Sequence, residues 1–326
     1  EGLGGGADEF SQTNIQVEGV DEADIVKNDG KYIAVLKGNT VRILEAYPGE
    51  NLKELSLIDL PSMNAWGQEM YLDDQHVVVI GTTYKNPHFP LPQEEKKSES
   101  LLFPWRYSFE NTRTMVVVYD ISNKEKPVKE RELSITGHSI SSRKIEKNVY
   151  LVVNQRIPFL PHLQNKEPEL LLPRIEDSAD GKEDRPLVSC PEVQYFPEAK
   201  GSNFLIIAGL NLSDAKAPVQ KQVLLGSGNT VYSSAKDLYI VESQFDHRNV
   251  ERSKEESVIY RFSLQPESIE FKKKGSVPGT ILNQFSMDEQ GNFFRIATER
   301  QTPLSPFTSA NNLYVIDRDS METVGK

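Results

Sequence analysis

The chain has 326 residues, of which 37% are hydrophobic and 26% are charged, and its formal net charge is −11. These are ordinary values for a globular protein, and the negative charge, with no basic cluster to offset it, excludes nucleic acid as an expected partner. The sequence has no apolar stretch long enough to span a membrane, so we expect a protein that is not membrane-spanning, and its one cysteine permits no internal disulfide.

The glycine-rich residues 1–12 predict a flexible linker ahead of a folded domain that covers residues 13–326. Within that domain, short runs of β-branched and aromatic residues alternate with turns rich in Asp, Asn and Gly. The runs recur as units of four strands, and tandem repetition of such units is the sequence pattern typical of a β-propeller. We therefore predict an all-β fold, a β-propeller of four-stranded blades with about five blade units, at residues 21–62, 64–137, 138–228, 229–280 and 281–326.

The second unit shows the pattern most clearly. Its strands are predicted at residues 70–72, 76–80, 115–120 and 128–137, and a three-residue polar turn separates the first two. Several of these runs are apolar at consecutive positions instead of alternating positions. Strands that are covered on both faces show this pattern, so we expect each blade to be packed between two neighbours.

Long insertions interrupt the units at about residues 82–112 and 154–202, each between the second and third strands of a unit. If the four strands of a blade are labelled A to D, the B–C and D–A connections lie at one end of the propeller, so the insertions should gather there. Aromatic and arginine side chains are enriched at interface hot spots, and an alternative is that these side chains cover the base of their own loops. The candidate partner-binding residues are Phe103, Trp105, Arg106, Tyr107, Tyr195 and Phe196.

The opening segment, residues 13–30 (TNIQVEGVDEADIVKNDG), resembles the signature of a family of secreted bacterial and archaeal β-propeller domains that are distantly related to WD repeats. A second resemblance lies in residues 282–289 (LNQFSMDE) and 294–298 (FRIAT). The resemblance implies a propeller fold and a secreted or cell-envelope, extracytoplasmic location, without an established activity. Because members of this family usually continue further, we also expect this chain to be truncated at its C-terminus.

The ring axis is a second candidate region. Three polar residues near predicted blade starts, His138, Asn283 and Gln284, are candidates to line an axial site. The carboxylates of Asp21, Glu22 and Asp24 could bind Ca²⁺, which prefers several oxygen ligands, although the alternative is a structural role in a turn between blades. We favour that structural role and expect no cofactor, with Ca²⁺ as the alternative. If the N-terminal segment closes the ring, residues 15–20 should pair beside the last blade.

No catalytic motif accompanies these candidates. The sequence lacks a metal-binding H-E-x-x-H, a nucleophile elbow and a phosphate-binding glycine loop, and no basic residue or histidine adjoins Cys190. We therefore name no catalytic residue and expect an extracytoplasmic scaffold for a protein or peptide partner, bound at the B–C end. The alternatives are a propeller that binds a small molecule, glycan or metal at the ring axis, with a hydrolase or lyase as one form of this alternative, and a purely structural spacer.

Overall fold

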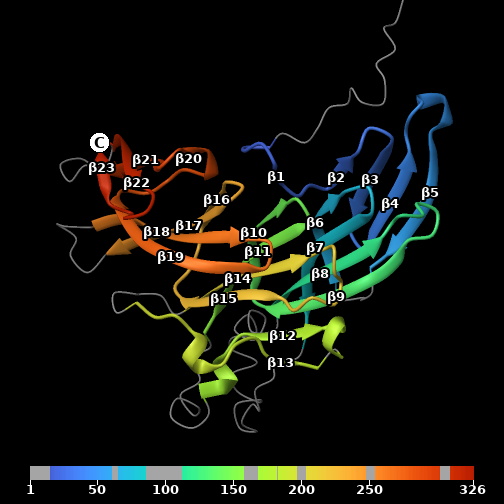
Figure 1. Cartoon of the computed structure of the whole chain (residues 1–326), viewed down its shortest axis with the longest axis horizontal. Coiled ribbons are helices and arrows are strands. Elements are labelled where there is room, and N and C mark those ends of the chain that lie inside the picture. The colour runs from blue at the N-terminus through green and yellow to red at the C-terminus, as the bar shows by residue number, and fades with distance from the viewer. Residues whose placement is uncertain are drawn as a thin grey trace, which may run out of the picture.

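A computed structural model describes residues 15–60, 65–85, 112–157, 168–181, 183–196, 203–246, 254–301 and 309–326. These residues form five antiparallel sheets that follow one another along an arc, from blade 1 at the blue end to blade 5 at the red end (Figure 1). The described residues contain no α-helix and only short 3-10 turns. The predicted all-β propeller fold is therefore confirmed.

Blades 1 and 2 each consist of four consecutive strands. Each strand pairs with the next along the chain, from the innermost strand A to the outermost strand D. Blade 1 consists of β2 (Val26–Asn28), β3 (Tyr32–Lys37), β4 (Thr40–Glu45) and β5 (Lys53–Asp59). Blade 2 consists of β6 (Ala65–Leu72), β7 (His76–Tyr84), β8 (Thr112–Asp120) and β9 (Val128–Thr136).

Blades 3 to 5 repeat the same order. Blade 3 consists of β10 (His138–Ile145), β11 (Asn148–Arg156), β14 (Asn203–Asn211) and β15 (Gln220–Leu225). Blade 4 consists of β16 (Thr230–Ser233), β17 (Asp237–Asp246), β18 (Lys254–Gln265) and β19 (Ser268–Pro278). Blade 5 consists of β20 (Met287–Gln290), β21 (Phe293–Gln301), β22 (Ser309–Asp317) and β23 (Thr323–Gly325).

Two blades carry additional strands that the sequence pattern did not predict. The insertion at residues 154–202, which interrupts blade 3, adds β12 (Arg174–Asp177) and then β13 (Arg185–Pro186) to the outer edge of blade 2, beside β9. In blade 3, the two-residue strand β1 (Val20–Asp21) pairs with the inner edge of β10. The insertion is held by a buried ion pair, in which Asp177 accepts hydrogen bonds from Arg131 Nε at 3.0 Å and Nη2 at 2.5 Å. Both side chains are only 3% exposed.

The core consists of four apolar clusters, one between each pair of adjacent blades. Strand β7 explains why the predicted runs are continuously apolar: Val77 and Val79 pack toward blade 1, whereas Val78 and Ile80 pack toward blade 3. Alternate side chains point to opposite faces of a strand, so a strand between two blades needs apolar residues at every position. Burial on both faces is thus the main source of stability for each central blade.

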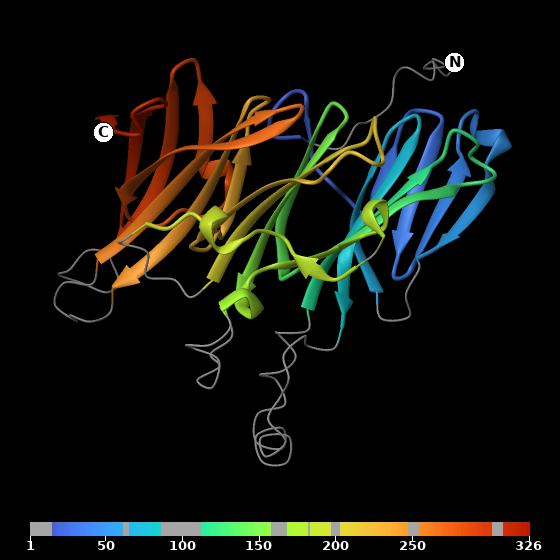
Figure 2. The same cartoon turned by 60° about the horizontal axis from the view of Figure 1, so that its bottom comes forward.

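The strands that flank the long B–C connections end at the same side of the arc. The last paired residues are Tyr84 with Thr112, Arg156 with Asn203, Asp246 with Lys254, and Gln301 with Ser309. Figure 2 shows this side of the arc as the lower edge of the sheets. We call this side the B–C end, and it also carries the D–A connections between successive blades.

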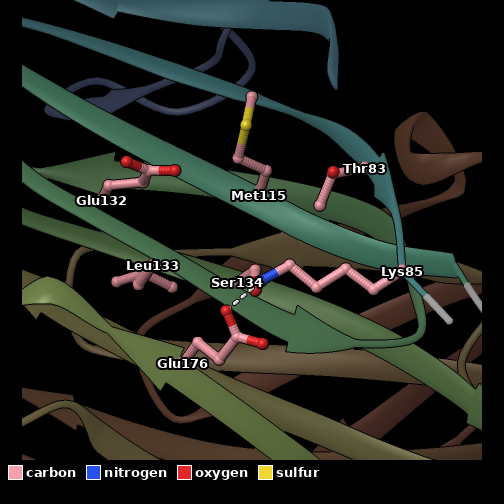
Figure 3. A pocket seen from close by; sticks show the side chains of 7 residues that line it. All are labelled: Thr83, Lys85, Met115, Glu132, Leu133, Ser134 and Glu176. Atoms are coloured by element: carbon pink, nitrogen blue, oxygen red, sulfur yellow. Dashed lines mark hydrogen bonds and ion pairs between the residues drawn. The ribbon is translucent and has the colours of Figure 1, made fainter. Parts of the chain in front are cut away.

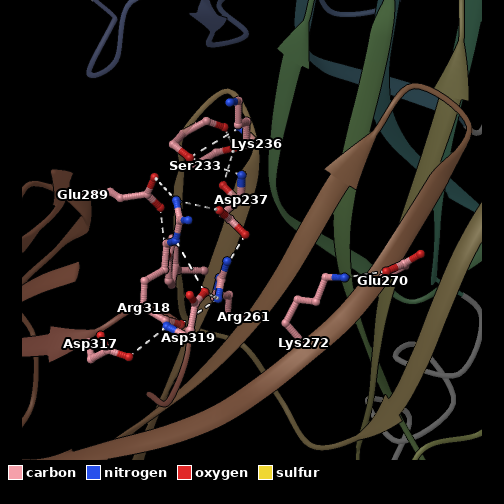
Figure 4. Close-up of polar contacts among 12 residues, drawn as sticks. Ser233, Lys236, Asp237, Arg261, Glu270, Lys272, Glu289, Asp317, Arg318 and Asp319 are labelled. Atoms are coloured by element: carbon pink, nitrogen blue, oxygen red, sulfur yellow. Dashed lines mark hydrogen bonds and ion pairs between the residues drawn. The ribbon is translucent and has the colours of Figure 1, made fainter. Parts of the chain in front are cut away.

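The opposite end carries a polar network between blades 4 and 5 (Figure 4). The buried carboxylate of Asp237 accepts a hydrogen bond from Arg261 Nε at 2.9 Å, and Arg261 Nη1 donates to the carbonyl of Arg318 at 2.6 Å. The hydroxyl of Tyr239 donates to Glu289 at 2.6 Å, and Arg318 lies 3.7 Å from the same Glu289 carboxylate. Because these bonds join strands of two blades, the network fixes how blade 5 sits on blade 4.

Candidate functional site

Residues 15–24, which we call the N-terminal segment, connect the innermost strands of three blades. Val20 and Asp21 pair with β10 of blade 3, and the backbone of Asp24 exchanges hydrogen bonds of 3.1 and 2.9 Å with Met70 of blade 2. Gln16 Nε2 donates to the carbonyls of Gln284 and Met287 in blade 5, at 3.0 and 3.1 Å. The expected backbone pairing beside the last blade is therefore wrong, because the segment pairs with blade 3 and reaches blade 5 through a side chain.

Next to the backbone of this segment is a group of polar side chains that we call the axial cluster. It consists of Glu22 of the segment itself, Glu69 of β6, Ser142 and Arg143 of β10, and Gln284 of the 3-10 turn before β20. The guanidinium of Arg143 donates to Gln284 Oε1 at 2.8 Å and lies 3.6 Å from the carboxylate of Glu22. Gln284 Nε2 in turn lies 3.3 and 3.4 Å from the two Glu22 oxygens. Side chains separated by more than 120 residues in sequence thus form one charge-neutralised network.

The second half of the axial cluster surrounds Ser142. Its hydroxyl donates to Glu69 at 2.7 Å and lies 2.8 Å from the hydroxyl of Tyr71. Burial raises the pKa of Glu69 above its ordinary value, and this effect outweighs the opposing hydrogen bond from Ser142 and the charge of Arg143. Burial likewise raises the pKa of Tyr71, so its phenol stays neutral. Among the described residues, the side-chain hydrogen bonds of the Ser142 hydroxyl are to Glu69 and Tyr71, and neither partner is a histidine.

The structure brings together two residues that the sequence analysis assigned to separate sites. Gln284, a candidate for the axial site, contacts Glu22, a candidate for metal binding. The other axial candidates lie nearby but have different surroundings: His138 is exposed at the start of β10, and Asn283 caps the 3-10 turn at Gln284–Ser286 by accepting from the amide of Phe285 at 2.9 Å.

The acidic residues of the predicted Ca²⁺ site point to different partners. Asp21 accepts a 2.7 Å hydrogen bond from Lys27, whose buried ammonium also donates to the carbonyl of Glu22 at 2.9 Å. Asp24 accepts from the amide of Ile25 at 2.7 Å. Within the described residues, no group of three or more His, Cys, Asp or Glu side chains is placed to hold a metal ion. Calcium binding by these residues stays a prediction.

Of the predicted partner-binding residues, only two are described. Tyr195 is 61% exposed. Phe196 is partly buried, with its ring centroid 5.3 Å from that of Phe271 and 6.0 Å from that of Tyr260, so it covers blade 4 and does not face solvent freely. Phe103, Trp105, Arg106 and Tyr107 lie outside the described residues.

The sequence analysis missed a set of exposed apolar side chains at the B–C end. Trp66 stands at the start of β6 and is 62% exposed, and Tyr84 at the end of β7 is 51% exposed. Leu282 and Phe285, in the connection that leads into blade 5, are 86% and 70% exposed. A single aromatic residue at a strand start carries no periodic signal, so only its position in the fold reveals its exposure.

A small pocket also opens at this end, between blade 2 and the insertion (Figure 3). Its volume is about 120 Å³, which is below the roughly 300–1,000 Å³ of pockets that hold drug-sized ligands. An ion pair between Lys85 and Glu176 crosses it, and the remaining lining residues are Thr83, Met115, Glu132, Leu133 and Ser134. The pocket is suited to a few water molecules or one small polar group.

Comparisons with known proteins support the architecture. A family model described as a beta propeller domain matches residues 10–326. An uncharacterized protein of Methanocaldococcus jannaschii is 24% identical, over 97% of this chain and 54% of the relative. An uncharacterized protein of Archaeoglobus fulgidus is also 24% identical, over 97% of this chain and 56% of the relative. The chain thus spans about half the length of these curated relatives.

Two solved structures share a distant likeness. The N-terminal domain of Nup159 has a TM-score of 0.27 and 10% identity, over 92% of this chain and 74% of that one. Drosophila Plexin A, solved in complex with Semaphorin 1b, has a TM-score of 0.28 and 8% identity, over 91% of this chain and 78% of that one. Likenesses this distant carry no functional argument. In the described part of the chain, no helix has the length and apolar character that crossing a bilayer requires.

Proposed function

Because the chain belongs to the beta propeller domain family, we propose that it is an extracytoplasmic scaffold that binds a protein or peptide partner at the B–C end. The observation that carries the proposal is the set of large apolar side chains exposed there: Trp66, Tyr84, Leu282 and Phe285. Exposed aromatic side chains on a rigid scaffold are typical anchors of protein interfaces. The extracytoplasmic part of the proposal rests on the resemblance of residues 13–30 to a secreted family.

Three features of this end suit a macromolecular partner. Trp66 lies in the inner strand of blade 2 and Phe285 in the 3-10 turn that precedes the inner strand of blade 5, so a partner that contacts both must extend across several blades. The folded part of the insertion gives the surface a fixed border, because the buried Arg131–Asp177 pair holds it to blade 2. The pocket beside it is too small for a larger ligand. Exposed apolar side chains spread over several blades favour a protein or peptide over a small molecule.

The axial cluster provides weaker support for the alternative function, an enzyme or ligand-binding propeller. Its carboxylates already face Arg143, Gln284 and Ser142, and the N-terminal segment lies across it. A ligand would have to replace hydrogen bonds that are satisfied within the fold, and leaving such buried groups unpaired costs about 1–3 kcal/mol each. The axial cluster is therefore better suited to joining blades than to catalysis.

The proposal is tested by site-specific photo-crosslinking in the source organism. A photoreactive phenylalanine analogue replaces Trp66 or Phe285, and the matched control replaces Leu52. Leu52 is 63% exposed, nearly the same as Trp66, but it lies between β4 and β5 at the opposite end of blade 1. We expect one discrete crosslinked protein from Trp66 and Phe285 and none from Leu52.

The identified partner is then titrated against purified variants. Alanine at Trp66 or Phe285 should weaken binding at least about tenfold, since truncation of a hot-spot aromatic costs about 2 kcal/mol or more, whereas Leu52→Ala should bind as the parent does. Equal crosslinking from both ends, or unchanged affinity in the Trp66 and Phe285 variants, contradicts the proposal. Protease accessibility of the protein in intact cells tests its location separately.

A further inference from the structure

Inside the arc, the faces of each blade that point toward a neighbouring blade are apolar and buried. Between blades 1 and 2, for example, Ala34 and Ile43 pack against Val79 and Met115, and none of these four side chains is more than 2% exposed. The same arrangement recurs at the other three junctions. Blades 2, 3 and 4 each have a neighbouring blade on both faces. Blades 1 and 5 lie at the two ends of the arc, so each has a neighbouring blade on one face only (Figures 1 and 2).

The outward face of blade 1 carries an apolar patch that none of the four clusters includes. We call it end face 1, and it is formed by Val26, Ile33, Val35, Leu44 and Leu57. Residues that pair across adjacent strands point to the same face of a sheet. Val26 pairs with Val35, and Ile33 pairs with Leu44. Val35 and Leu57 both pair with Arg42, on the strand between them. Val26 and Leu57 are 45% and 44% exposed. Surface strands normally present polar residues on their solvent side, whereas here the five apolar side chains share the face with Lys37, Thr40, Arg42, Glu54 and Asp59.

The outward face of blade 5 also carries an apolar patch, which shares the face with the polar side chains of Arg295, Glu299, Asn311 and Asp317. We call it end face 5, and it is formed by Phe293, Ala297, Leu313 and Val315. Phe293 and Leu313 are 46% and 54% exposed, whereas their neighbours Phe294 and Tyr314, which point toward blade 4, are buried. Each end face contains one ion pair amid its apolar side chains, Arg42–Glu54 in blade 1 and Asp288–Arg295 in blade 5. The two faces therefore resemble the faces that meet inside the arc.

We propose that both end faces are docking surfaces for further four-stranded blades of the same polypeptide, which join blade 5 to blade 1 and close the ring. The curated relatives supply the reason to choose this occupant: the match covers 97% of this chain but only 54% and 56% of the relatives, so they carry nearly as much sequence outside the match as within it. Closure also removes two uncovered lateral faces, which would otherwise favour association with other chains. The proposal does not depend on a partner at the B–C end.

The test measures how fast a single thiol on each end face reacts with a maleimide. The native cysteine, Cys190, is exposed and is first changed to serine. In that background, Val26→Cys probes end face 1 and Leu313→Cys probes end face 5. Val128→Cys is the control, because Val128 is 60% exposed at the start of β9, away from both faces. Each variant is made as residues 1–326 and as the complete polypeptide that the source genome encodes.

In the 326-residue chain all three thiols should react rapidly. In the complete polypeptide, the thiols at Val26 and Leu313 should react at least about tenfold more slowly, because reaction then requires the covering blade to open, whereas the Val128 thiol should be unaffected. Equal rates in the two proteins overturn the proposal, and so does protection at only one end face. Protection that is already present in the 326-residue chain and is lost on dilution would identify a second copy as the occupant, which also overturns it.

Discussion

Replacing Asp177 with alanine should detach the insertion from blade 2. Asp177 accepts two hydrogen bonds from Arg131, and both side chains are 3% exposed, so the substitution leaves a guanidinium buried without its counter-charge. Arg131 Nη1 still donates to the carbonyl of Ala217 at 2.9 Å, but a neutral acceptor does not balance the charge. The alanine also removes the cap that Asp177 provides to the amide of Ala179 at 3.0 Å.

The expected loss of stability follows from the burial of the pair. Removing one partner of a buried ion pair costs about 3–5 kcal/mol, because the remaining charge is not solvated. Unfolding entropy near 60 °C is about 2.1 cal/mol/K per residue, so a chain of this length has about 0.7 kcal/mol/K, and Tm should fall by about 4–7 °C. Calorimetry gives Tm, and urea denaturation gives the free energy of unfolding.

Two variants make the reasoning refutable. Asp180→Ala removes an ion pair with Arg185 in the same insertion, but those side chains are 39% and 45% exposed, so the loss should not exceed about 1 kcal/mol. The double change Arg131→Met with Asp177→Leu removes both charges and should recover much of the stability. If Asp177→Ala costs no more than Asp180→Ala, or if the double variant is as unstable as Asp177→Ala, the buried pair does not hold the insertion.

Two further predictions concern the ring axis. Burial raises the pKa of Glu69 above the value of about 4.5 expected in an unfolded chain, so this carboxyl favours the folded state at low pH and the advantage is lost as pH rises through the folded pKa. Glu69→Gln should therefore gain stability relative to the parent as pH rises above 4.5, and a difference in unfolding free energy that does not vary with pH would contradict this. Deleting residues 1–20 should destabilise the domain by about 2 kcal/mol more than deleting residues 1–14, because it removes the buried Val20 and the hydrogen bonds of Gln16. Equal Tm values for the two deletion variants would show that residues 15–20 do not contribute to stability.

The strand pattern predicted the fold class because a short run of consecutive residues determines whether a strand is apolar on both of its faces. Val77 to Ile80 are apolar at consecutive positions, and the covered faces of blade 2 follow directly from that run. Strand β12 could not be predicted in the same way. Its pairing depends on Arg131 meeting Asp177 from 46 residues away, and four residues with mixed polarity carry no period of their own.

The axial cluster shows a similar division. Residue type alone singled out Glu22 and Gln284 as polar candidates, but nothing local indicated that they would meet, because 262 residues separate them. Glu69, Ser142 and Arg143 were not singled out at all. A hint was present in β10, whose sequence HSISSRKI is unusually polar for a strand within a propeller blade, as suits an inner strand beside the ring axis.

The N-terminal segment also sets an order of assembly. Gln16 bonds to carbonyls at positions 284 and 287, so its contacts with blade 5 must wait until about 270 further residues have been synthesised. Blades that form from neighbouring strands can fold as they emerge, whereas contacts of such long sequence separation are slow to form. The N-terminal segment is therefore synthesised before the blades that it joins but reaches its final position after them, and β1 stays unpaired in the nascent chain until blade 3 exists.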